Sequence, residues 1–471
     1  MSGLAIEIEL EYWFYYQRSL LGAPEQPKTP QGAHSAGNTK GNAVNSVQPE
    51  KGAWGIVALL FLFMMINFAD KAIIGLAGVP IMTELNLTPK QFGLVGSSFF
   101  LLFSISAVVT GFIVNRVRSK WVLLIMGLVW ALVQFPMMGT VGIEMLIACR
   151  IVLGAGEGPA YPVALHAAYK FFPDEKRAIP SAVIAQGSAV GVVIAIPILN
   201  AIITNYNWHY AFGALGIAGL AWVAAWALLG REGRIEEQAV AEGAVADARV
   251  PYRDLLLSPT NLASWSAYFG AYFGLALVLS WFTPYLVKGL GFEQSLAGKL
   301  TALPFIAGFF VVIGGSWLSQ RMMHAGFTSR VARGILCGAA ICLGGLALLG
   351  APYAPNVTTT IILIIAGTTL PSVAYILSPA ILGEITPASQ RGAVLAINSA
   401  VGTSAGIIAP YLMGSVIEGA ASAAEGYSLG FTVCGVVTLV GGLIGLAFLR
   451  PEAERAGFAL RTNATATVAP A

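Results

Sequence analysis

The stretch that decides the fold reads Cys149-Arg150-Ile-Val-Leu-Gly154-Ala-Gly156-Glu157-Gly158-Pro159-Ala160-Tyr161-Pro162. It places an arginine and a glutamate well inside a hydrophobic run. Because Arg150 and Glu157 are seven residues apart in the chain, a helix holds them roughly 10 Å apart on nearly the same face. A charge near the centre of a bilayer is costly, so such residues usually face the interior of a bundle or a water-filled cavity. The stretch therefore predicts a polar site inside a membrane-embedded helix.

The residues around Glu157 favour close approach by a neighbouring helix or by a ligand. Glycines at positions 154, 156 and 158 remove side chains, and Pro159 and Pro162 interrupt the backbone hydrogen bonding just beyond. One interpretation is a structural ion pair that fastens two helices together. The other is an anion site at Arg150 coupled to a proton site at Glu157.

Composition indicates the class of protein. Of the 471 residues, 56% are hydrophobic and only 10% are charged, against about 25% charged in ordinary soluble domains. Apolar runs of roughly 20 residues recur along the chain, and each is long enough to cross a bilayer. We therefore expect an all-α polytopic membrane protein.

No enzyme motif competes with this interpretation. The four cysteines lie in apolar runs without paired spacing, so they predict neither disulfides nor a metal site. The chain has no phosphate-binding Gly-Lys-Ser/Thr loop, which excludes an ATP-driven pump. We expect no enzymatic activity, no cofactor, no metal and no nucleic-acid partner.

Twelve membrane spans are predicted. Their approximate bounds are 53–79, 91–114, 120–140, 143–169, 178–203, 208–230, 261–287, 297–320, 331–351, 358–382, 392–418 and 427–449. The expected organisation is a disordered cytoplasmic tail (1–52), a six-helix bundle (53–230), a charged cytoplasmic loop (231–260), a second six-helix bundle (261–450) and a cytoplasmic tail (451–471).

The basic residues predict the orientation, because loops on the cytoplasmic side carry an excess of lysine and arginine. With both termini inside, the opposite side holds only Lys90, Lys288 and Lys299. The cytoplasmic segments then hold Arg116, Arg118, Lys120, Lys170, Lys176, Arg177, Arg231, Arg234, Arg249, Arg253, Arg321, Arg330, Arg333, Arg391, Arg450, Arg455 and Arg461. We expect a multi-pass protein of the inner (plasma) membrane.

The two halves of the chain resemble each other weakly. Gly111 to Lys120, after the second span, has a counterpart in Gly315 to Arg321 after the eighth, and Pro173-Asp-Glu-Lys-Arg177 has a counterpart in Pro387-Ala-Ser-Gln-Arg391. Two like halves are typical of a transporter with a site at the bilayer midplane, which opens alternately to each side.

With these motifs, residues 53–450 resemble the major facilitator superfamily, and within it the anion:cation symporter family of sugar-acid and aromatic-acid carriers. The Gly111–Lys120 loop departs from the superfamily signature because Asn115 replaces the usual aspartate. The more specific matches are Asn67-Phe-Ala-Asp70-Lys71, Arg150 to Pro162, and Phe172-Pro173 followed by Arg177.

The resemblance implies protonatable sites at Asp70 and Glu157, and contacts from Lys71 and Arg150 to a substrate carboxylate. Lysine at position 71, where many relatives have arginine, keeps the charge but loses the bidentate fork. Physical chemistry agrees, because an anion that neutralises a buried cation favours protonation of a nearby carboxylate, so that substrate and proton bind cooperatively. The alternative for Asp70 and Lys71 is that one or both extend toward a helix end.

Five further residues are candidate substrate contacts. Gln186 and Asn398 occupy similar places in the two halves, and Tyr161, Phe103 and Ser378 also lie in or next to predicted spans. Phe103 stands where similar sugar-acid carriers have a tyrosine, and it favours a less hydroxylated or an aromatic acid together with Phe99, Phe100, Tyr272, Trp281 and Tyr375. The alternative for Gln186 and Asn398 is an interhelical hydrogen bond, and for Ser378 a bond to a backbone group freed beside Pro379.

The expected function is proton-coupled symport of a small organic carboxylate by a monomer in the lipid bilayer, with sodium coupling left open. One rival is a proton-driven drug exporter, although the predicted fifth span lacks the Gly-Pro pair typical of such exporters. The other is a receptor that binds without transport, although the loop 231–260 and the termini are too short and polar for a signalling domain.

Overall fold

The computed structural model describes residues 50–114, 117–173, 176–233 and 250–458. The tails that we expect to be disordered or cytoplasmic, most of the central loop and two short loop segments (1–49, 115–116, 174–175, 234–249 and 459–471) lie outside the described residues. Within the described ranges the regular structure is entirely helical, which confirms the all-α prediction.

The first half contains α2 (Ala53–Leu76), α3 (Gly78–Glu84), α4 (Pro89–Ser98), α5 (Phe103–Val114), α6 (Ser119–Gln134), η1 (Phe135–Met138), α7 (Ile143–Glu157), α8 (Ala160–Tyr169), α9 (Ala178–Asn205) and α10 (Trp208–Leu229). The second half contains α12 (Tyr252–Leu256), α13 (Pro259–Pro284), η4 (Tyr285–Gly289), α14 (Gln294–Leu300), α15 (Leu303–His324), η5 (Arg330–Ile335), α16 (Leu336–Gly350), η6 (Ala351–Tyr353), α17 (Val357–Thr369), η7 (Leu370–Val373), α18 (Ala374–Ile385), α19 (Ala388–Thr403), α20 (Ala405–Gly419) and α21 (Ala423–Phe448).

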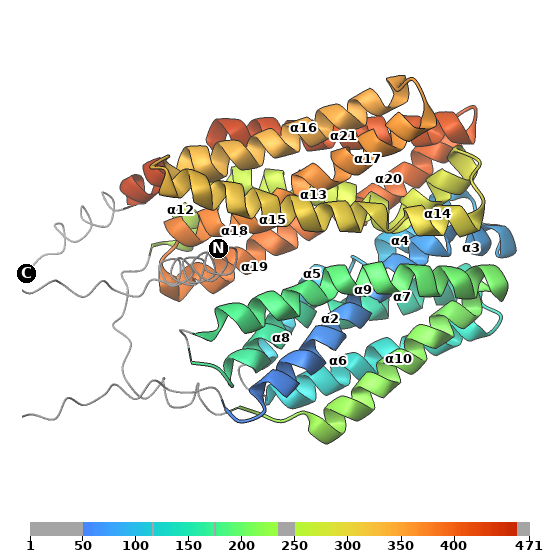
Figure 1. The fold of residues 1–471 in the computed structure, drawn as a ribbon, viewed down its shortest axis with the longest axis horizontal. Helices are drawn as coiled ribbons and strands as arrows, with labels where there is room; N and C mark the ends of the chain where they lie inside the picture. The colour runs from blue at the N-terminus through green and yellow to red at the C-terminus, as the bar shows by residue number, and fades with distance from the viewer. Residues whose placement is uncertain (1–49, 115–116, 174–175, 234–249, 459–471) are drawn as a thin grey trace, which may run out of the picture.

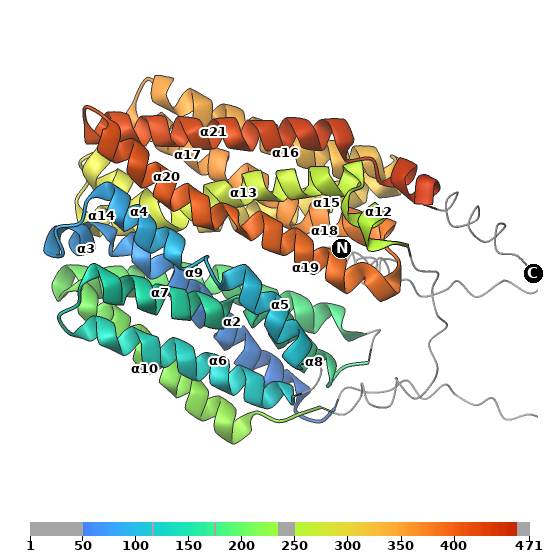
Figure 2. The ribbon, with the colours of Figure 1, turned by 180° about the vertical axis from the view of Figure 1, so that it is seen from behind.

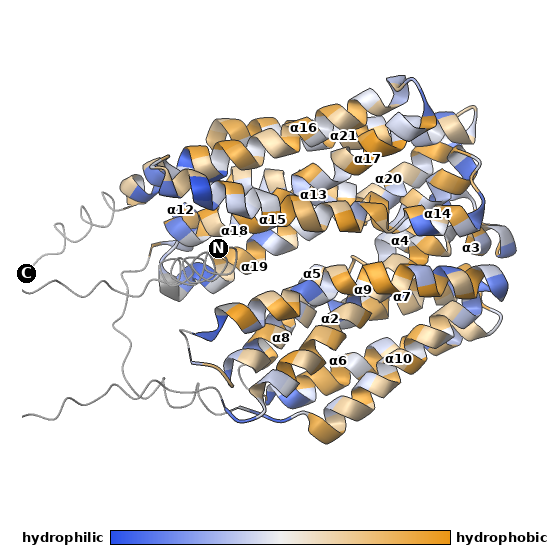
Figure 3. Cartoon of the chain, in the orientation of Figure 1, coloured by the Kyte–Doolittle hydropathy of each residue, from blue (hydrophilic) through white to orange (hydrophobic). Residues whose placement is uncertain are grey.

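These helices form two bundles that lie side by side, the first from blue to green and the second from yellow to red (Figures 1 and 2). We call the end at which α2 begins and α12 lies the tail end, and the end that carries α3 and α14 the opposite end. Apolar residues run along the lengths of the helices, and polar residues gather at both ends (Figure 3). This distribution is the one that a bilayer requires of a helix bundle.

The described residues hold eleven helical stretches long and apolar enough to cross a membrane, and several of these join two or three of the elements given above. The twelfth expected span, 143–169, is divided into α7 and α8 at Gly158 and Pro159. A proline has no backbone N–H, so it disrupts the hydrogen bonding of a helix at this point. Within the described residues, eleven long stretches together with α7 and α8 therefore account for twelve crossings, and the break between α7 and α8 comes directly after Glu157.

The glycines of the broken helix let the second span approach closely. A Cβ atom at Gly154 would lie 1.8 Å from the carbonyl oxygen of Phe99, and one at Gly158 would lie 1.9 Å from that of Phe103. Both distances are far inside van der Waals contact, so only glycine fits at either position. The close neighbour that the sequence predicts at these glycines is thus a helix.

The two bundles contact each other at the opposite end. A Cβ atom at Gly93 in α4 would lie 2.4 Å from the carbonyl oxygen of Pro410 in α20. Nearby, Tyr411 N donates to Ser97 Oγ (3.0 Å) and Lys90 N to Glu418 Oε2 (3.1 Å). The backbones of the two halves are therefore packed together on this side of the midplane.

Each half has, at the tail end, one carboxylate that accepts hydrogen bonds from the start of another helix of the same half. Glu232, just after α10, accepts hydrogen bonds from the backbone N–H groups of Ser119 and Lys120 (both 3.1 Å) at the start of α6. Glu452, just after α21, accepts from the N–H of Arg330 (3.0 and 3.1 Å) at the start of η5. An acidic group at a helix N-terminus is stabilising, and its repetition supports the similarity of the two halves.

Candidate functional site

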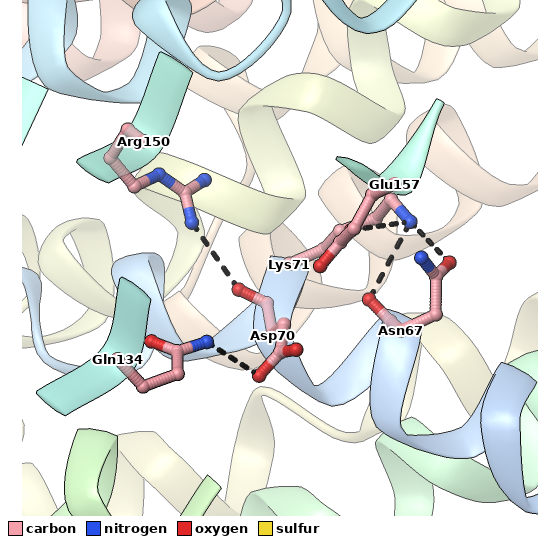
Figure 4. Close-up of polar contacts among 6 residues, drawn as sticks. All are labelled: Asn67, Asp70, Lys71, Gln134, Arg150 and Glu157. Carbon is pink, nitrogen blue, oxygen red and sulfur yellow. Dashed lines mark hydrogen bonds and ion pairs between the residues drawn. The ribbon is translucent and has the colours of Figure 1, made fainter. Parts of the chain in front are cut away.

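A buried ion pair joins the first and fourth spans. Lys71 Nζ in α2 lies 2.9 Å from Glu157 Oε2, the last residue of α7. The Lys71 and Glu157 side chains are 5% and 0% exposed, so the pair is shielded from water. Lys71 Nζ also contacts the side-chain oxygen of Asn67, one turn earlier in α2 (Figure 4).

Asp70 points away from this pair. Gln134 Nε2 in α6 donates to Asp70 Oδ1 (2.8 Å), and Arg150 Nη1 in α7 donates to the main-chain oxygen of Asp70 (3.3 Å). Consecutive helical residues are turned by about 100°, so Asp70 and Lys71 contact different helices. Figure 4 shows the result, with Gln134 and Arg150 on one side of Asp70 and the Lys71–Glu157 pair on the other.

Aromatic rings surround the two cations. Lys71 Nζ lies 4.6 Å from the ring centroid of Phe68 and 5.4 Å from that of Phe103. The guanidinium carbon of Arg150 lies 4.6 Å from the ring centroid of Phe99. Such contacts attract a cation electrostatically without neutralising its charge. Both cations are therefore held in place and remain able to pair with an anion.

The four charged groups balance, because Asp70 and Glu157 can carry two negative charges and Lys71 and Arg150 carry two positive ones. All four residues are at most 4% exposed. Buried polar atoms of this cluster are nevertheless left without a hydrogen-bond partner, namely Glu157 Oε1 and Arg150 Nε. Because such atoms are rare in native structures, they mark places where water or a ligand would bond.

Nothing in the described ranges resembles a metal centre, since no group of three His, Cys, Asp or Glu side chains is found together there.

Of the other predicted residues, Phe103 lies beside Lys71, as given above, whereas Asn398 and Ser378 lie in the second bundle. There Ser264 Oγ donates to Asn398 Oδ1 (3.1 Å) and Asn398 Nδ2 donates to Ser378 Oγ (3.2 Å). All three are 1% exposed or less. The interhelical hydrogen bond that we weighed for Asn398 is thus present, between α19 and α18.

Gln186 and Tyr161 lie outside the charged cluster. Gln186 is half-buried in α9, and Tyr161 at the start of α8 is 40% exposed. In the described part of the chain, neither of them has a hydrogen bond to one of the four charged side chains. The substrate contacts that we predict for Gln186 and Tyr161 therefore stay predictions.

Sequence reasoning missed Gln134 and gave Asn67 no role. Gln134 is the partner of the Asp70 carboxylate, and Asn67 contacts Lys71. The available signal was polarity alone, since each is an amide inside an apolar span, at 120–140 and 53–79. Amides in spans more often join helices, so the pairing with Asp70 needed the packing of α6 against α2.

Comparison with known proteins agrees with this architecture. Residues 59–410 match the family model of the Major Facilitator Superfamily. The chain is 24% identical to the D-galactonate transporter of Escherichia coli O6:H1, covering 85% of this chain and 96% of that one. It is 26% identical to the hexuronate transporter of Bacillus subtilis (84% and 94% covered) and 28% identical to the probable sulfoacetate transporter of Cupriavidus necator (84% and 93%).

Solved structures show the same fold. A bacterial homologue of the human lysosomal transporter Spinster superposes with a TM-score of 0.70 at 18% identity, covering 86% of this chain and 98% of that one. A D-xylose–proton symporter gives a TM-score of 0.69 at 16% identity, with 85% and 99% covered. The family match spans well over half of the sequence, and the relatives named here are transporters and not enzymes. The chain is therefore a membrane transporter that belongs to the major facilitator superfamily and resembles its anion:cation symporters.

Proposed function

We propose that this protein is a proton-coupled symporter that takes up a small organic anion, a carboxylate such as a sugar acid or an aromatic acid, by alternating access. The observation that carries the proposal is the buried Lys71–Glu157 ion pair at 2.9 Å within a charge-balanced cluster. Lys71 and Arg150 are the proposed contacts for the substrate carboxylate, and Asp70 and Glu157 are the proposed proton sites.

The coupling follows from charge balance. A substrate carboxylate that pairs with Lys71 takes this cation from Glu157 and adds one negative charge to a cluster whose charges cancel. An uncompensated buried charge costs about 3–5 kcal/mol. Protonation of Glu157 removes that charge and also releases Lys71. Anion and proton therefore bind best together, which is the thermodynamic requirement for symport.

The names of the relatives are a second support for this substrate class. They describe transporters of D-galactonate, of hexuronate and, as a probable assignment, of sulfoacetate. All three are small organic anions. The aromatic rings around Lys71 and Arg150 favour substrates with an apolar face, so aromatic carboxylates belong in the test beside sugar acids.

The second bundle would supply the remaining contacts. Asn398 and Ser378 are buried and bonded to each other, and an exchange of that bond for one to a substrate hydroxyl or carboxylate is the role we propose for them. Phe103, next to Lys71, would contact the body of the substrate. Gln186 and Tyr161 are proposed as contacts made as the two bundles move.

The distribution of basic residues supports placing the tail end, with both termini, in the cytoplasm of a cell with an inner or plasma membrane. In that orientation the contact of α4 with α20 closes the outer side. We propose that the protein works as a monomer, because each chain contains both halves of the site.

The test uses purified protein in liposomes with a pH-sensitive dye inside. D-galactonate, D-glucuronate, sulfoacetate, benzoate and succinate are added outside, with and without sodium. Acidification of the interior that requires one of these acids and needs no sodium is the expected result. The variant Arg150→Ala should abolish it, whereas Arg321→Ala, an exposed arginine at the end of α15, should not.

No acidification with any of the acids, together with uptake driven by a sodium gradient or export of a cationic drug, would refute the proposal. Full anion affinity in the Arg150→Ala variant would refute the role of Arg150 alone.

A further inference from the structure

A small cavity lies beside the charged cluster, inside the first bundle. It has a volume of about 10 Å³ and is lined by side chains of α6, η1, α7 and α10. Gln134 and Arg150 are its polar lining residues, and Met137, Cys149 and Phe212 are among the less polar ones. All of these residues belong to the first half of the chain.

The cavity suits one water molecule. A water needs about 10–15 Å³ and two or more polar partners. Arg150 Nε is a donor in a residue that is 3% exposed, and it has no hydrogen-bond partner. The Gln134 amide supplies a second polar group. A water here would satisfy Arg150 Nε, which is otherwise an unpaired buried donor.

Both polar residues of the cavity also contact Asp70. Gln134 Nε2 donates to Asp70 Oδ1 (2.8 Å), and Arg150 Nη1 donates to the Asp70 main-chain oxygen (3.3 Å). A single side chain therefore separates the cavity from the carboxylate. Rotation of the Gln134 amide would bring the water into contact with Asp70. The other charged groups that face Asp70 are Lys71 and Glu157, on the far side of it (Figure 4).

The wall of the cavity toward the opposite end leads to a titratable pair at the surface. The Met137 carbonyl contacts His209 Nδ1, and His209 Nε2 lies 2.8 Å from Glu84 Oε1. Glu84 has a side chain that is 47% exposed, whereas that of His209 is 14% exposed. Phe212, which lines the cavity, follows His209 by three residues in α10. The order through the first bundle is thus the exposed Glu84, then His209, then the cavity, and finally Asp70.

We propose that this cavity is a water site through which Asp70 receives its proton from the opposite end, with the Glu84–His209 pair at its outer end and Gln134 as the positioning residue. The inference rests on the proposed proton coupling. In the step itself, hydronium in the cavity gives up H⁺, an O–H bond forms on the Asp70 carboxylate, and water remains.

This path would give Asp70 and Glu157 separate routes for proton exchange. Asp70 would exchange protons through the first bundle even while the backbones of α4 and α20 are in contact at the opposite end. Glu157, paired with Lys71, would exchange only when substrate displaces it. A separate path lets the protein load a proton before the substrate route opens.

Cys149 offers a test with a matched control. It is half-buried, lines the cavity and belongs to none of the proposed binding contacts. Cys149→Leu adds volume that fills the cavity, whereas Cys149→Ala at the same position leaves it open. Val133→Met, from α6, fills the cavity independently if Cys149→Leu does not fold.

The full-length variants are reconstituted in liposomes with D-galactonate, or the acid found active above, as the probe. We expect Cys149→Leu and Val133→Met to keep counterflow exchange at equal pH within about twofold of the wild type. Uptake driven by a pH gradient should fall by about tenfold, its pH profile should shift toward acid, and it should acquire a solvent deuterium isotope effect. Cys149→Ala should match the wild type in both assays. Gln134→Leu should reproduce the selective loss.

Equal rates in both assays for the filled variants would overturn the path, and so would a parallel loss of both activities. If wild-type protein exchanged the acid but showed no uptake with the pH gradient, proton coupling itself would be refuted, and the path with it.

Discussion

Replacing Glu157 by glutamine leaves the Lys71 ammonium in the bundle without its carboxylate, at nearly unchanged side-chain volume. In the wild type the two atoms are 2.9 Å apart and almost fully buried. Substrate must therefore compete with Glu157 for Lys71 whenever Glu157 is ionised. In the variant that competition is absent at every pH.

The size of the effect follows from the cost of an unpaired buried charge, which is about 3–5 kcal/mol. The empty variant bears this cost, and an anion that pairs with Lys71 relieves it. We expect at least about 1.4 kcal/mol of it to appear as binding energy, which is a tenfold lower Kd at alkaline pH. Wild-type affinity should weaken by up to about tenfold per pH unit as pH rises, because one proton must accompany the anion. The affinity of the variant should change less steeply with pH, because Asp70 is then the remaining proton site of the cluster.

Isothermal titration of the purified protein with the active acid, at acidic and at alkaline pH, measures both effects. Liposome assays add the functional counterpart, in which Glu157→Gln retains counterflow exchange but loses uptake driven by a proton gradient. The matched control is Glu144→Gln, an exposed position in the first turn of the same helix. It should behave as the wild type in all assays.

Two results would refute this reasoning. Equal loss of binding and transport in Glu157→Gln would mean that the ion pair only fastens α2 to α7. Binding that keeps the wild-type pH dependence would place the coupled proton elsewhere, with Asp70 as the remaining carboxylate of the cluster.

Three further outcomes are expected. Asp70→Asn should abolish uptake driven by a proton gradient and preserve exchange, and a variant that still acidifies the liposomes would exclude Asp70 as a proton site. Partial burial raises the pKa of Glu232, but hydrogen bonds from Lys170, Ser119 and Lys120 outweigh it and hold that pKa below its usual value. Glu232→Gln should therefore lower stability by about 1 kcal/mol at neutral pH, and the difference should fade as pH falls below about 4.5 through the native pKa; a loss in Tm that is independent of pH would contradict this. Gly154→Ala should lower the free energy of unfolding by about 1–3 kcal/mol or more, because the added Cβ would lie 1.8 Å from the Phe99 carbonyl oxygen. Gly392→Ala, with no atom within 4 Å of the added carbon, should leave the Tm equal or higher, and equal destabilisation of both variants would contradict the close packing.

The sequence by itself determined the class of protein, the approximate bounds of the spans and the four charged residues. Hydrophobic runs are local, and their length relates directly to bilayer thickness, so the spans could be placed within a few residues. The cost of a buried charge is equally independent of the fold. Asp70, Lys71, Arg150 and Glu157 therefore stood out without any knowledge of which helices touch.

Only the tertiary structure decided which of these groups face each other. Lys71 pairs with Glu157, whereas Arg150 turns to the backbone of Asp70 and Gln134 takes the carboxylate. These partners come from α2, α6 and α7, which are far apart in the chain, and the spacing along one helix says nothing about the rotation of its neighbours. The cavity beside Asp70 has the same origin, because it exists only where α6, η1, α7 and α10 fail to fill the space between them.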